Sequence, residues 1–126
     1  MDEFDVIWND AADYGAEGRV PDGTAAGIEQ LAWLLRVYNS AMGGGVSFAL
    51  EVNEPFRIRR AIDAMRYFGL TAPADLLEDV LGRSLRGESA DSWPSDDDFY
   101  DLLDDETVRT AFREKAAQVP IDFGRQ

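Results

Sequence analysis

The sequence predicts an all-α protein, a compact single-domain bundle of about six helices joined by short turns. Three observations lead to this prediction. Apolar residues recur every three or four positions along successive segments, a spacing that gathers them on one face of an α-helix. No stretch alternates β-branched and polar residues, as a half-buried strand would. The chain has 126 residues, 45% of them hydrophobic, which is enough for one core but leaves little room for a second.

The N-terminal segment, about residues 2–15, is expected to form an acidic helix. Its apolar stripe consists of Phe4, Ile7, Trp8, Ala11 and Tyr14. At about 100° per residue, the acidic side chains fall on the opposite face: Glu3, Asp10, Asp13 and Glu17. Gly15 and Gly18 mark the end of this helix.

A helical core is expected over about residues 24–86. Its first, long helix buries Ile28, Leu31, Leu34, Leu35, Tyr38 and Met42. Gly43-Gly44-Gly45 is expected to stop this helix, because three glycines lose too much entropy to stay helical. Residues 46–53 then form a short helix that returns to the core. The inward side of that helix is predicted to hold Phe48, Ala49 and Val52.

Two more helices complete this predicted core. Pro55 suits a first helical position, and the helix that it opens ends at Gly69. Its inward residues are Ile58, Ala61, Ile62, Met65 and Phe68. Thr71 is expected to cap the next helix, which Gly82 weakens. That helix buries Leu76, Leu77, Val80 and Leu81.

The C-terminal region, about residues 95–119, is predicted to be helical and acidic. It follows the one long loop, residues 87–95. Ser95 and Asp98 resemble a capping box with Asp in place of Glu. The helical stretch breaks near Asp104-Asp105 and ends at Pro120. Its inward residues are Phe99, Leu102, Leu103, Val108 and Phe112.

Negative charge lies at the two ends of the chain. Residues 1–35 hold eight acidic residues and one basic residue, and residues 88–126 hold eleven and four, whereas residues 36–87 hold six and seven. The net charge of −13 attracts basic surfaces and repels nucleic acid and anionic membranes. Adaptation to high salt is an alternative explanation, but it would spread acidic residues over all solvated faces, including the middle of the chain.

The composition argues against most enzyme classes. Cysteine and histidine are both absent, so thiolate ligands, imidazole bases and the usual nucleophile pairs are missing. A hydrolase would have to use carboxylates such as Glu78/Asp79 or Asp104/Asp105, and no pattern places these in a cleft. We therefore expect no enzyme activity and no cofactor.

Metal and membrane motifs are not found either. An EF-hand loop that starts at Asp96 fails at its fifth, sixth and twelfth positions, so no metal site is expected. No apolar run reaches about 18 residues, and the acidic N-terminus is unlike a secretory leader. Together with the missing cysteines, these features predict a cytoplasmic protein.

The densest acidic run lies near the C-terminus. On a continuous helix Asp97, Asp101, Asp104 and Asp105 would stand at i, i+4, i+7 and i+8, on one stripe. Carboxylates four residues apart rise by about 6 Å along a helix, and phosphates on one DNA strand rise by about 3.4 Å per step. Such a row could therefore occupy side chains that otherwise bind phosphate. The alternative is an ordinary solvated helix face.

Two other features, the basic cluster and Trp93, each allow two interpretations. The basic cluster between Arg57 and Arg66 could pair with Glu51, Glu54 and Asp63, or with an acidic surface of a second copy in a homodimer. Trp93 could anchor a partner, or it could hold its loop on the core.

Several stretches of the chain share the pattern of a known family. Residues 38–48, YNSAMGGGVSF, followed by Asn53, resemble the helix–turn–helix motif of the bacterial DNA-mimic-like helical domain, a family catalogued as a domain of unknown function. Residues 61–69 resemble the next helix of that family with its closing glycine. Residues 97–102, followed by residues 120–123, are similar to its C-terminal motif.

This resemblance covers about residues 28–123, with Met42-Gly43 in place of the Asn-Gly pair of the motif. It implies an all-α fold, often dimeric, and an acidic surface that in a characterised member occupies the DNA-binding face of a transcription factor. Related small acidic domains act as immunity proteins beside bacterial toxins. The resemblance implies no catalytic residues.

The sequence therefore predicts a non-enzymatic inhibitor that binds a basic protein, either a nucleic-acid-binding protein or a toxin, and that contacts neither nucleic acid nor membrane directly. An immunity protein is the alternative function, and a carboxylate hydrolase is the least favoured one. The predicted partner-binding residues are Asp97, Asp98, Asp101, Asp104, Asp105, Glu3, Asp10 and Asp13.

Overall fold

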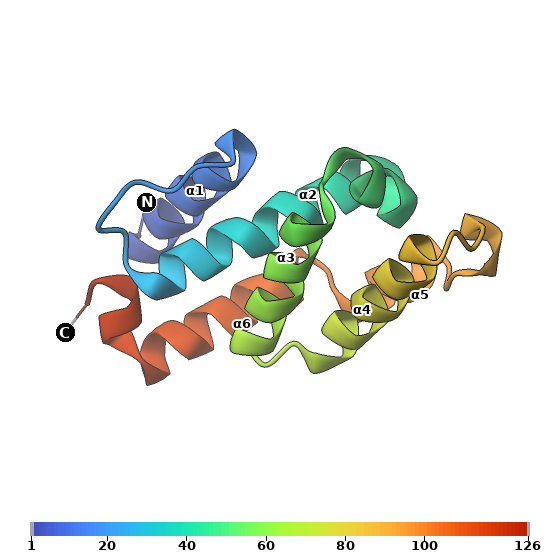
Figure 1. The fold of residues 1–126 in the computed structure, drawn as a ribbon. Coiled ribbons are helices and arrows are strands. Elements are labelled where there is room, and N and C mark those ends of the chain that lie inside the picture. Colours follow the sequence, from blue (N-terminus) through green and yellow to red (C-terminus); the bar gives the residue numbers. More distant parts are fainter. Residues whose placement is uncertain (1, 126) are drawn as a thin grey trace.

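The computed structural model describes residues 2–125 and is built from helices (Figure 1). The six α-helices are α1 (Glu3–Glu17), α2 (Ala26–Val52), α3 (Pro55–Tyr67), α4 (Thr71–Leu85), α5 (Asp96–Leu102) and α6 (Asp105–Gln118). Two 3₁₀ turns, Ala90–Ser92 and Pro120–Phe123, follow α4 and α6. No strand occurs within residues 2–125, so the predicted all-α class is confirmed.

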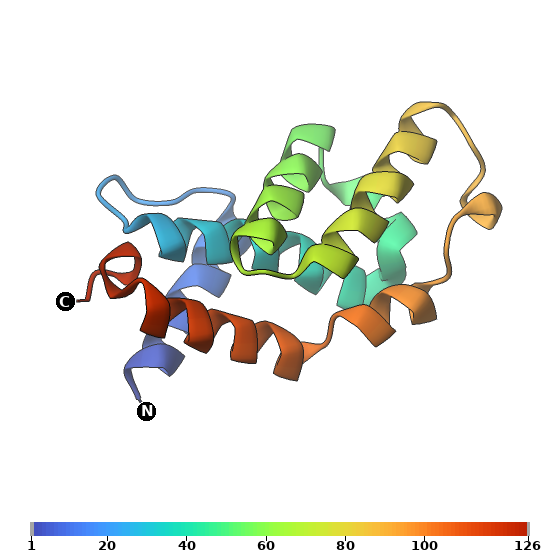
Figure 2. The same cartoon turned by 90° about the horizontal axis from the view of Figure 1, so that it is seen from below.

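The long helix α2 lies at the centre of the bundle. Its most extensive contacts are with α1 and α3, and α4 packs in turn on α3. Seen from below, α6 runs along the side of α2 that lies away from α3, and α5 is nearly in line with α6 (Figure 2). Buried side chains from all six helices form one hydrophobic cluster. Among the largest members are Tyr38, Phe99 and Phe112.

Several helices begin where the sequence predicts. In α5, Ser95 accepts the Asp98 N–H and Asp98 accepts the Ser95 N–H, so the predicted capping box forms. Pro55 is the first residue of α3, as expected. Thr71, predicted as the cap of α4, is instead its first helical residue, and Leu70 stands at the cap without a side-chain bond. Gly82 lies inside α4, which continues to Leu85.

The three glycines do not stop α2 as predicted. Gly43 and Gly44 are helical, and only Gly45 leaves the helix, with φ 88° and ψ 171°. The helix restarts at once because the Asp96 carboxylate accepts the Val46 N–H at 2.9 Å. This bond caps the second half of α2 from a segment 50 residues away. The predicted stop is therefore a kink held by a distant side chain.

The kink also changes which residues of α2 face the core. Val46 and Ala49 are buried, but Phe48 and Val52, both predicted inward, are 42% and 48% exposed. Met42, just before the kink, is 49% exposed. Helical spacing within residues 46–53 alone fits either Phe48, Ala49 and Val52 or Val46, Ala49 and Asn53 as the inward side. The kink at Gly45 sets the direction of this half of the helix, and the second set is the buried one. Leu102, also predicted inward, is 37% exposed because α5 ends there.

Candidate functional site

The candidate site is the stretch of residues 96–106, which we call the acidic segment. It comprises α5, the break after it and the first residues of α6, and it holds no basic residue. Its seven carboxylates are those of Asp96, Asp97, Asp98, Asp101, Asp104, Asp105 and Glu106. All seven residues are exposed. None of them forms an ion pair with another residue of the described chain.

Four of these carboxylates also hold the fold together. Asp96 caps the kink of α2, and Asp98 completes the capping box of α5. Asp104 caps α6 by accepting the Thr107 N–H at 2.8 Å, which lowers the pKa of Asp104. Asp105 accepts the Tyr38 hydroxyl at 2.7 Å. These bonds fix the carboxylates in place while leaving them exposed to solvent.

The remaining three carboxylates, those of Asp97, Asp101 and Glu106, form no hydrogen bond with the rest of residues 2–125. Asp97 and Asp101 lie one turn apart on α5. The negative charge of these side chains is therefore exposed to solvent and available to a partner.

The single stripe expected for this segment does not form. Leu103 is extended, with φ −147° and ψ 111°, and Asp104 has φ −130° and ψ 176°. The buried Leu103 side chain and the Asp104 cap end one helix and begin another. The predicted helical step of about 6 Å therefore applies only to Asp97 and Asp101. Asp104 and Asp105 lie on a separate helix start.

The acidic residues of α1 divide into two groups. In the first turn, Glu3 pairs with Arg125 at 3.2 Å, and Asp2 and Asp5 lie 3.5 and 3.8 Å from Arg113. Farther along, Asp10 and Asp13 are exposed and form no ion pair within the described part of the chain. Of these five residues, only Asp10 and Asp13 have carboxylates without an ion pair in the described chain.

Aromatic contacts bring α1 beside α6. The rings of Phe4 and Trp8 lie 5.8 and 6.2 Å from that of Phe112. The Arg109 guanidinium lies 4.1 Å from the centre of the Trp8 ring, and Arg113 covers Phe4. In Figure 2, α1 crosses α6 at the end far from α5. The eight predicted residues therefore form two separate groups, one on α1 and one in the acidic segment.

Half of the six carboxylates within residues 36–87 form ion pairs. Arg66 binds Asp75 at 2.9 Å and Glu78 at 2.7 Å, so this member of the basic cluster pairs internally, with partners on α4 rather than the predicted ones. Arg57 and Arg60 lie over the rings of Trp33 and Phe56. Arg83 pairs with Asp79, and Arg86 with Glu88. The acidic segment differs from this region in having no cation of its own.

Trp93 holds its loop on the core. The side chain is partly buried and packs against the hydrophobic cluster. Its indole N–H is buried, with no acceptor among the residues that the structure describes. Of the two interpretations of Trp93, the structure supports the loop anchor.

Sequence reasoning missed the structural bonds of the segment because they join distant parts of the chain. In the sequence Asp96 is one of several neighbouring acidic residues, whereas in the structure its carboxylate accepts a hydrogen bond from the Val46 N–H. Helical spacing predicts Tyr38 as a core residue but does not predict that its hydroxyl donates a hydrogen bond to Asp105. The only local sign of the bond between Asp96 and Val46 is the glycine run at residues 43–45, and this run does not indicate which residue caps the kink.

Within residues 2–125, no group of three or more metal-ligating side chains is arranged to hold an ion. No helix of the described chain combines the length and the apolar character that crossing a bilayer needs. No protein-family model, no curated protein and no solved structure matches this chain.

Proposed function

We propose that this is a non-enzymatic interaction protein of the cytoplasm, whose acidic segment occupies a basic, nucleic-acid-binding surface of a partner protein. One observation carries the proposal: the seven exposed carboxylates within residues 96–106 form no ion pair with any residue of the described chain. Like charges one helical turn apart destabilise a helix by about 0.2–0.5 kcal/mol per pair. A surface that retains them creates a strong local field, which speeds encounter with a basic partner.

The density of negative charge in the acidic segment suits a partner that normally binds phosphates. Duplex DNA presents about one negative charge per 1.7 Å, and proteins that bind it present clusters of Lys and Arg. The carboxylates of Asp98, Asp104 and Asp105 are already held by hydrogen bonds. Binding to them loses less side-chain entropy than binding to mobile side chains. Membership of the DNA-mimic-like family, which the resemblance over about residues 28–123 suggests, is part of the same proposal.

The experiment compares capture by three forms of the immobilised protein from a lysate of the source cells. One variant, Asp97→Asn with Asp101→Asn, removes the two α5 charges that the fold does not use. The control, Glu51→Gln with Asp63→Asn, removes two exposed charges outside the segment, which also lack an ion pair in the described chain. Both variants change the net charge equally.

We expect the wild type and the control to capture a basic nucleic-acid-binding protein, which salt and added duplex DNA both release. The α5 variant should lose this protein. Equal capture by all three forms would contradict the proposal. Capture of a toxin that duplex DNA does not release would instead favour the immunity function.

A further inference from the structure

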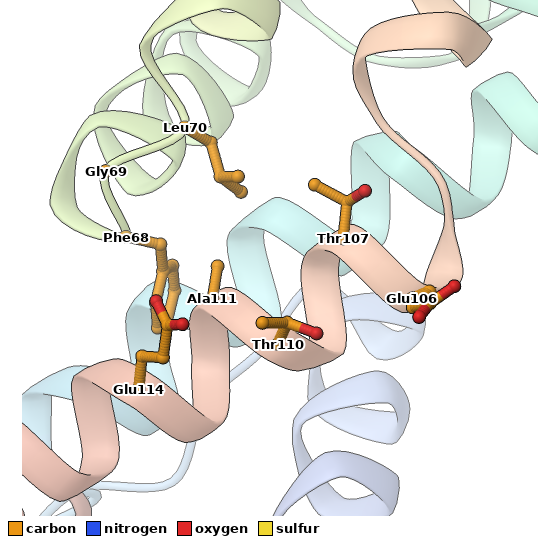
Figure 3. Close-up of a pocket in the computed structure, with 8 residues that line it drawn as sticks. All are labelled: Phe68, Gly69, Leu70, Glu106, Thr107, Thr110, Ala111 and Glu114. Atoms are coloured by element: carbon orange, nitrogen blue, oxygen red, sulfur yellow. The ribbon is translucent and has the colours of Figure 1, made fainter.

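A groove lies between α6 and the corner that joins α3 to α4 (Figure 3). Its volume is about 390 Å³. Figure 3 shows Phe68, Gly69 and Leu70 along one side, facing Thr107 and Ala111 of α6 on the other. Glu106 and Glu114 stand at the two ends of the α6 side. The groove begins at the last residue of the acidic segment, Glu106.

The chemistry of the groove suits a long side chain with a cationic end. Phe68 and Leu70 form an apolar wall, each less than a tenth exposed. Glu106 and Glu114 are exposed and have no ion pair among residues 2–125. Lysine and arginine side chains characteristically lay their aliphatic stems on apolar surface while the charged head stays near solvent.

The cations at the far end of the groove are already engaged. A second hollow of about 380 Å³ shares Phe68 and Glu114 with the groove and continues to Arg66 and Lys115. Arg66 is bonded to two carboxylates of α4. The Lys115 ammonium lies 4.7 Å from the centre of the Tyr67 ring. The stretch from Glu106 to Glu114 therefore has two carboxylates and no competing cation among the lining residues.

We infer that this groove receives an extended basic segment of the partner, with one Lys or Arg head at Glu106 and a second at Glu114. The inference rests on the proposed function and adds where the partner inserts. Glu106 and Glu114 are eight residues apart on α6, about 12 Å along its axis. Two side chains four residues apart on an extended strand are about 13 Å apart and point to the same side. The spacing of the two cationic side chains therefore matches that of the two glutamates, and their positive charge complements the two carboxylates.

The test uses the peptide acetyl-Arg-Ala-Ala-Ala-Arg-amide as probe, with a Gln-for-Arg peptide as control. Amide resonances of the ¹⁵N-labelled full chain are followed by NMR at low salt. We expect saturable shifts at Gly69, Leu70 and Ala111 with the arginine peptide only. Thr110→Lys places a cation in the groove at an exposed helical position. This change should raise the dissociation constant of the arginine peptide about fivefold.

Shifts confined to residues 96–101, no saturable shift, or equal binding by Thr110→Lys would each overturn the inference. A circular dichroism spectrum of Thr110→Lys like that of the wild type shows that the fold is kept. If the peptide test fails in one of these ways but the lysate experiment still yields a partner that DNA displaces, only the groove inference is overturned. If the peptide binds in the groove but no basic partner is captured, the proposed function fails instead.

Discussion

Replacing Gly45 by alanine should disrupt the contact that positions α5. Gly45 has φ 88° and ψ 171°, a region that is essentially restricted to glycine. A Cβ atom at this position would lie 2.5 Å from one oxygen of the Asp96 carboxylate. That carboxylate would have to move away and would release the buried Val46 N–H.

The expected loss follows from these two effects. Holding a non-glycine residue in this backbone conformation costs about 1–3 kcal/mol. Leaving a buried N–H unpaired costs about 1–3 kcal/mol more. Because the chain can relax around the site, we expect Gly45→Ala to lower the free energy of unfolding by about 2–4 kcal/mol. This is a large fraction of the stability of a typical domain, about 5–15 kcal/mol.

Urea unfolding followed by circular dichroism measures this change as a lower midpoint with an unchanged slope. The matched control is Gly43→Ala. Gly43 is helical, and a Cβ there meets nothing within 4 Å. This control should stabilise the protein by about 0.5–1 kcal/mol. A Gly45→Ala protein within about 0.5 kcal/mol of the wild type would refute the reasoning, since surface changes without such a mechanism fall in that range.

Three further predictions concern stability. Burial, reinforced by hydrogen bonds to carboxylates, raises the pKa of Tyr38 and Tyr67. Their stabilisation is therefore complete below the unfolded pKa of about 10 and declines as the pH rises further. Unfolding measured between neutral and alkaline pH should show this decline, and the decline should become smaller when both are changed to Phe, leaving the part due to Tyr100, whose pKa is also raised by burial. Changing Asp97 and Asp101 to Asn should alter the unfolding free energy by no more than about 0.5 kcal/mol, because the helix dipole favours the charge of Asp97 in the first turn of α5 and disfavours that of Asp101 in its last turn. A larger loss in a urea titration would show that they support the fold. Ser95→Ala should lower the thermal midpoint through a loss of about 1 kcal/mol at the cap, and an unchanged midpoint would contradict the role of the capping box.

Most of the fold could be predicted because its signals are local. The inward residues of α3 and its C-cap, from Ile58 to Phe68, follow from helical spacing alone. The capping box at Ser95 and the break before Asp105 are written within a few residues. The error at Phe48 has a different origin. It follows from the kink at Gly45, which depends on a carboxylate 50 residues away.

The sequence predicts which acidic residues make up the candidate site, but not which of them form ion pairs. The sequence shows where carboxylates are dense, and all eight predicted residues are exposed. Glu3 looked equivalent to Asp10 and Asp13, yet only Glu3 meets Arg125. That contact depends on how the C-terminus packs beside α1, which no local pattern encodes. Residues free to bind a partner therefore had to be identified from the structure.

The dissociation constant of the captured partner tests the central claim most directly. It should be measured at low salt for the wild type, for Asp97→Asn with Asp101→Asn, and for Glu51→Gln with Asp63→Asn. We predict that the α5 variant binds about tenfold more weakly, whereas the matched control stays within about twofold of the wild type. Equal weakening in the two variants would show that the partner senses only the net charge and would contradict a binding surface in the acidic segment.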